Sequence, residues 1–60
     1  MKVIYYVEEF NEMIGENDEW EGIYKAFTYE AANQYIERIK MGLVTDKYPE
    51  GMYRVVSDVY

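Results

Sequence analysis

Sixty residues without a single cysteine or histidine leave this chain few ways of holding a fold together. Neither a disulfide nor a zinc ion bound by these side chains can support it. A domain of about 60 residues buries only about 60% of the surface that its unfolded chain exposes. Domains this small depend on very good packing or on oligomerisation. We therefore expect one small domain over residues 1–60 that associates as a homodimer.

The net charge of −6 lies entirely in the first half of the chain. Residues 1–30 carry two basic and eight acidic side chains, whereas residues 31–60 carry four of each. Direct binding to nucleic acid is not expected, because affinity for phosphates depends on clustered lysine and arginine. The apolar run at 3–7 is too short for a signal-peptide core or a membrane span. We expect a cytoplasmic protein that does not bind membranes.

The pattern along the chain predicts two strands, a helix and a third strand. Residues 2–8 and 20–27 are typical of strands, and the acidic, turn-forming residues 11–19 are typical of a loop. Thr28 is a good helix N-cap and Gly42 a good left-handed C-cap. Helical spacing then places five apolar residues on one face: Ala32, Tyr35, Ile36, Ile39 and Leu43. The turn-forming residues 48–51 precede the last strand, 52–60.

These elements predict an α+β fold of order ββαβ. The first two strands should pair antiparallel, and the first, being the most continuously apolar, belongs in the middle. The connection from the second strand through the helix to the third should be right-handed. We therefore predict a three-stranded sheet of order 2-1-3 with one helix packed on one face.

Alternation along the strands separates two faces of this sheet. The face expected to carry the helix is uncharged and consists of Val3, Tyr5, Val7, Trp20, Gly22, Tyr24, Ala26, Tyr53, Val55, Ser57 and Val59. The opposite face holds Lys2, Ile4, Tyr6, Glu8, Glu21, Ile23, Lys25, Phe27, Met52, Arg54, Val56, Asp58 and Tyr60.

The second of these faces combines seven apolar side chains with three acids and three bases. Such a patch is typical of a two-fold interface, in which each base can meet an acid of the other copy. A half-solvated sheet with scattered apolar residues is the ordinary alternative. We predict a dimer interface formed by Ile4, Tyr6, Ile23, Phe27, Val56 and Tyr60.

Seven acids between positions 8 and 21 form a segment without any basic residue: Glu8, Glu9, Glu12, Glu16, Asp18, Glu19 and Glu21. This segment is either a solvated loop that supports solubility, or a partner-binding surface that imitates a phosphate backbone. A calcium loop is not expected, because the alternating acids and central glycine of that motif are missing. We predict no metal and no cofactor.

Trp20 is the only tryptophan, and it is either an anchor of the core at the sheet edge or an interface hot spot. Tyr48 and Tyr60 are better candidates for contacts than the tyrosines of the core face. For catalysis the chain offers one serine, Ser57, and no histidine to activate it. We therefore expect no enzymatic activity.

Three segments carry a resemblance to a known group of proteins. The run WEGIYKAFTYEAA from Trp20, the run YIERIK from Tyr35 and the run YPEGMY from Tyr48 resemble very short phage and prophage proteins of ββαβ order. Among inhibitors encoded by phages, the chain looks like the very short homodimeric anti-defence type, such as those acting against the Hachiman system. The resemblance implies a phage-encoded inhibitor that blocks a bacterial anti-phage defence protein or another host protein.

Two alternatives to this function stay open. An acidic mimic of DNA would occupy the nucleic-acid groove of a host enzyme, and its binding would fall steeply with added salt. A protein that sequesters a small molecule would hold its ligand in a tyrosine-lined pocket at the dimer seam, and ligand binding would raise its thermal stability.

Overall fold

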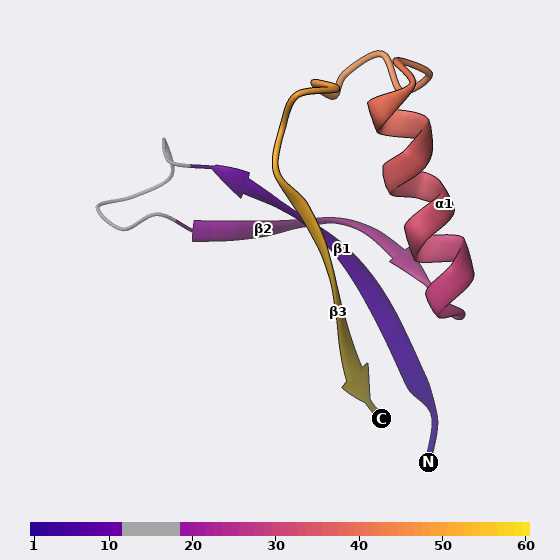
Figure 1. Ribbon diagram of the computed structural model, residues 1–60. Helices are drawn as coiled ribbons and strands as arrows, with labels where there is room; N and C mark the ends of the chain where they lie inside the picture. Colours follow the sequence, from indigo (N-terminus) through magenta and orange to yellow (C-terminus); the bar gives the residue numbers. More distant parts are fainter. Residues whose placement is uncertain (12–18) are drawn as a thin grey trace.

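The computed structural model describes residues 1–11 and 19–60. Its elements follow the order β1 (Val3–Asn11), β2 (Glu19–Ala26), α1 (Tyr29–Lys40) and β3 (Tyr53–Val59). The sheet has the order β2-β1-β3, and both outer strands run antiparallel to β1. Helix α1 lies against one face of this sheet, and the chain termini lie near each other at one end (Figure 1). The predicted ββαβ fold and strand order are confirmed.

Both ends of α1 are fixed by the residues that the sequence indicated. The Thr28 hydroxyl accepts a hydrogen bond from the Ala31 amide at 3.0 Å, which satisfies one donor of the first turn. Gly42 has a φ of 78°, and the Gly42 and Leu43 amides donate to the carbonyls of Ile39 and Arg38. This pair of bonds is the Schellman motif. Because it ends the helix, Leu43 is exposed, and its predicted place on the packed helix face is wrong.

The core between α1 and the sheet is small. Val7, Ala26 and Ala32 form its buried centre, with partly buried neighbours packed around them. Tyr24 of β2 stacks on Tyr35 of α1, with ring centroids 4.0 Å apart and planes 5° from parallel. Two of the three central residues are alanines, so the packed volume depends on tyrosine rings at its margin.

A β-bulge in β2 divides this strand into two parts. Val7 of β1 pairs with Tyr24, but the next residue, Glu8, pairs with Gly22, so Ile23 is the extra residue. An extra residue shifts the alternation by one position, so the side chains before it occupy the opposite faces from those that an unbroken strand would give them. Ile23 itself packs against the core on the helix side. Its predicted place on the opposite face is therefore wrong.

The same reversal moves the residues of β2 that precede the bulge. Trp20 pairs with Phe10 and Gly22 with Glu8, so both lie on the face away from α1 and not on the helix face as predicted. Glu21 pairs with Glu9 and takes the helix-side face instead of the opposite one. The predicted alternation was continuous, and one inserted residue breaks it.

The molecule is flat and open. Its Cα atoms extend 35 × 30 × 13 Å with a radius of gyration of 12.0 Å, compared with about 10 Å for a compact domain of this length. The accessible surface is 4690 Å², whereas a monomer of this mass typically exposes about 4,100 Å². Within residues 1–11 and 19–60, no helix or strand covers the side of the sheet opposite α1.

Candidate interaction surface

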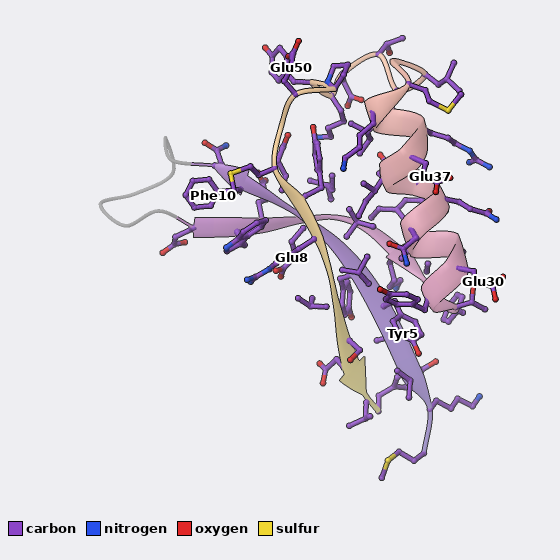
Figure 2. The ribbon with its side chains drawn as sticks, viewed as in Figure 1. Tyr5, Glu8, Phe10, Glu30, Glu37 and Glu50 are labelled. Carbon is purple, nitrogen blue, oxygen red and sulfur yellow. The ribbon has the colours of Figure 1, made fainter. Side chains whose placement is uncertain are left out.

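The side of the sheet away from α1, called the open face below, is the candidate functional surface. Strand register places on it Ile4, Tyr6, Glu8, Phe10, Trp20, Gly22, Lys25, Arg54, Val56 and Asp58. Figure 2 shows Glu8 and Phe10 on this side and Tyr5 directed toward the beginning of α1. The open face has two distinct regions, one toward each end of the strands.

The first region is the Trp20 cluster, which consists of Glu8, Phe10, Trp20 and Arg54. Arg54 Nε donates to Glu8 Oε1 at 2.7 Å across the β1–β3 pair. Its guanidinium carbon lies 4.2 Å from the centroid of the Trp20 ring. Phe10 meets the same indole edge to face, with centroids 5.3 Å apart. Each side chain thus fixes a neighbour, and none of the four is fully buried.

The Trp20 cluster has the composition of a binding hot spot. Tryptophan and arginine dominate such sites, because rigid aromatic area loses little side-chain entropy on binding. Glu8 neutralises Arg54, so the arginine can be covered by a partner without leaving an unpaired charge. Sequence reasoning placed Trp20 on the helix-side face, as a core anchor or a hot spot, because it assumed unbroken alternation. Gly22, a glycine inside a strand pattern, was the available signal of a bulge.

The second region is a hollow of about 330 Å³ at the other end of the open face. It is lined by Ile4, Tyr6, Lys25, Phe27, Asp58, Val59 and Tyr60. Ile4 is only 8% exposed, whereas the Phe27 and Tyr60 side chains that border the hollow are 68% and 64% exposed. Four residues of the predicted dimer interface therefore lie together here. Val56, a fifth, pairs with Tyr6 on the same face.

Two opposite charges stand at the borders of the hollow. Lys25 of β2 pairs with Tyr6, and Asp58 of β3 pairs with Ile4, so the charges lie on the two edge strands. Asp58 Oδ1 accepts a hydrogen bond from the Val59 amide at 2.8 Å. Neither Lys25 nor Asp58 has an oppositely charged partner among the residues that the structure describes.

The seven acids of the predicted partner-binding segment fall into three groups. Glu8 is bound to Arg54, and Glu9 forms an ion pair with Lys47 at 3.7 Å. Glu19 and Glu21 are exposed at the sheet edge. The other three, Glu12, Glu16 and Asp18, lie outside the described residues. Of the four described acids, two are held in ion pairs and two are exposed at the sheet edge.

Glu9 also takes part in a contact that attaches the segment after α1 to the sheet. The Tyr53 hydroxyl donates to the Tyr48 carbonyl at 2.7 Å and lies 3.3 Å from Glu9 Oε2. Burial raises the pKa of Tyr53, and the negative charge of Glu9 raises it further. The Gly51 amide donates to the same Tyr48 carbonyl at 3.0 Å, which closes the predicted turn. Glu9 is thus part of the fold's own bonding.

The described residues add no second kind of site. Within residues 1–11 and 19–60, no group of three or more acidic, histidine or cysteine side chains is placed to hold a metal ion. In the same ranges, no helix has the length and apolar character needed to cross a membrane.

Comparison with known proteins returns nothing similar. No protein-family model, no curated protein sequence and no solved structure matches the chain.

Proposed function

We propose that this chain is a non-enzymatic inhibitor that binds and blocks a bacterial anti-phage defence protein or another host protein, acting as a homodimer in the host cytoplasm. The Trp20 cluster is the observation that carries this proposal. It presents an indole, a phenyl ring and a neutralised guanidinium on a rigid sheet. A surface of this composition favours recognition of another protein.

The negative charge of the chain favours a partner whose surface is basic around the contact. The net charge is −6, and the exposed Glu19 and Glu21 flank Trp20 in the sequence at the edge of the sheet. Complementary charge at the rim of an interface speeds association more than it adds affinity. The Trp20 cluster would then supply affinity, and the acids would supply steering and selectivity.

The class of the partner comes from the resemblance to short phage proteins. That resemblance rests on the second strand, the helix and the turn before the third strand, and it adds the expectation of a phage-encoded inhibitor. The chemistry of the described surface is consistent with inhibition by occupation of a site on the partner, since the chain needs no reaction of its own for this.

The proposal is tested by capturing partners on the tagged chain from bacterial lysate at about 0.1 M and about 1 M salt, where the screening length is about 10 Å and about 3 Å. We expect one protein retained in stoichiometric amount at both salt concentrations. Trp20→Ala should weaken its binding about 30-fold, the equivalent of about 2 kcal/mol. Trp20→Phe should retain more of the affinity because it keeps an aromatic ring beside Phe10 and Arg54.

Tyr29→Ala is the matched control, because Tyr29 is an exposed aromatic residue at the beginning of α1, off the open face. Its truncation should leave partner binding unchanged. A captured inhibition target whose affinity is equal for the wild type, Trp20→Ala and Tyr29→Ala would contradict the role of the Trp20 cluster.

The two alternatives predict different outcomes. A DNA mimic would capture a nucleic-acid enzyme that is lost at high salt, and charge reversal of Glu12, Glu16, Asp18 and Glu19 would abolish binding. If inhibition survives that reversal, the acidic segment has no role in it. A small-molecule binder would capture no protein and would be stabilised thermally by its ligand, such as a nucleotide. The volume of the hollow, about 330 Å³, is at the lower end of the range for ligand pockets.

A further inference from the structure

We propose that a second copy of this chain docks on the hollow of the open face, around a two-fold axis parallel to β1 that brings Lys25 of each copy to Asp58 of the other. This inference deepens the homodimer part of the proposed function and rests on it. The hollow lies at the end of the open face opposite the Trp20 cluster.

Surface area is the first argument for a second copy. The chain exposes 4690 Å², about 600 Å² more than a monomer of its mass typically does. A standard interface buries about 800 Å² on each partner. The excess is of the same order as the area that one dimer interface removes from each partner.

The apolar surface around the hollow is the second argument. Ile4 is covered by its own chain, but Phe27 and Tyr60 are mostly exposed at the border. Large aromatic side chains at the border of an apolar recess are typical of the centre of an interface. Two-fold symmetry gives each hollow the same neighbour, so the exposed Phe27 and Tyr60 side chains of both copies would be removed from water together.

Charge is the third argument, and it selects the direction of the axis. Lys25 and Asp58 lie on opposite edge strands, and their β1 partners are Tyr6 and Ile4. A two-fold axis that lies between two stacked sheets and runs parallel to β1 exchanges β2 with β3. It therefore brings Lys25 over β3 of the other copy, two positions along the strand from Asp58, within reach of a lysine side chain. Sheets packed face to face keep their strands within about 30° of each other, which this axis satisfies.

The other charges of the open face are consistent with this arrangement. Glu8 and Arg54 neutralise each other within one chain, so they do not require a second copy. Lys25 and Asp58 form no ion pair among the described residues, and neither does the exposed Lys2, which lies beside Tyr60. In the dimer, each of the two Lys25 side chains meets the Asp58 side chain of the other copy.

The test compares Lys25→Asp and Asp58→Lys, alone and mixed, by sedimentation velocity of the purified full chain. The wild type should sediment as a dimer. Each single variant places like charges opposite each other twice per dimer, and its dissociation constant should rise about tenfold or more.

An equimolar mixture of the two variants should form a heterodimer as tight as the wild type. The aspartate introduced at position 25 of one chain then faces the lysine introduced at position 58 of the other. At the second contact, the unchanged Lys25 and Asp58 face each other as in the wild type. An ion pair within one chain would not be restored by mixing.

Lys40→Asp is the control, since Lys40 is an exposed charge on α1 away from the open face, and it should leave the dimer unchanged. Circular dichroism of each variant checks that the fold is intact. A monomeric wild type, a dimer insensitive to both reversals, or a mixture that fails to restore association would overturn the inference. Partner capture is measured separately, with Trp20→Ala and Tyr29→Ala, so failure of the dimer and failure of the inhibitor proposal are distinguishable.

Discussion

Gly51 occupies a position where no side chain fits. A Cβ built there would lie 2.8 Å from the Tyr53 hydroxyl oxygen and 2.9 Å from the ring carbon that bears it. Gly51→Ala must therefore displace the Tyr53 ring and its hydrogen bond to Tyr48. We expect a loss of about 1–3 kcal/mol in the free energy of unfolding, measured by urea denaturation.

Gly22→Ala is the comparison for Gly51→Ala, because nothing lies within 4 Å of a Cβ built at Gly22. This substitution should change the free energy of unfolding little. Equal losses for the two variants would mean that backbone freedom, and not contact with Tyr53, is what glycine supplies at position 51.

The raised pKa of Tyr53 gives the fold a dependence on alkaline pH. Burial and Glu9 favour the neutral phenol in the folded state, whereas an unfolded tyrosine ionises near pH 10. The contribution of Tyr53 to the free energy of unfolding is therefore complete below about pH 10, and it is lost as the pH rises through the pKa of Tyr53 in the folded state. We expect the free energy of unfolding to fall as the pH rises above about 10, and to fall less in Tyr53→Phe. A variant with the same decline as the wild type would contradict this.

At the scale of the elements, α1 depends on the Thr28 cap. The hydroxyl of Thr28 satisfies the Ala31 amide at 3.0 Å, and the helix has only 12 residues. Thr28→Ala should lower the free energy of unfolding by about 1 kcal/mol, measured by thermal or urea denaturation. Thr28→Ser keeps the acceptor oxygen and should restore most of the loss. If the serine variant is as unstable as the alanine variant, the methyl group of Thr28 matters more than its hydrogen bond.

The elements also mark the limit of prediction from this sequence. The helix ends, the turn at 48–51 and the strand order follow from local signals such as Thr28, Gly42 and the apolar middle strand, and all are confirmed. The face of Trp20 was predicted wrongly, because alternation carries no information about where a residue is inserted. Only the pairing of Val7 with Tyr24 and of Glu8 with Gly22 reveals the insertion. The Trp20 cluster could therefore not be assembled from the sequence, whereas four residues of the hollow could.

At the scale of the whole molecule, the small core links stability to association. Among the described residues, Val7 and Ile39 are the largest fully buried side chains, and a domain of this length has little apolar burial to offset its chain entropy. A dimer that covers the hollow would stabilise the folded chain by mass action. We expect the melting temperature to rise with protein concentration in the wild type and less so in Lys25→Asp. A melting temperature independent of concentration would indicate a fold that is stable as a monomer.

Because of the bulge at Ile23, the number of residues in β2, and not only their types, determines which side chains of β2 lie on the open face. Deletion of one codon at this point would leave every other amino acid in place, yet it would turn Trp20 toward the helix side of the sheet and Glu21 toward the open face. A single deletion can therefore change which residues of β2 lie on the open face, without any amino-acid substitution. Comparison of this chain with relatives should first establish whether their second strand carries the extra residue of the bulge, and only then compare residue identities.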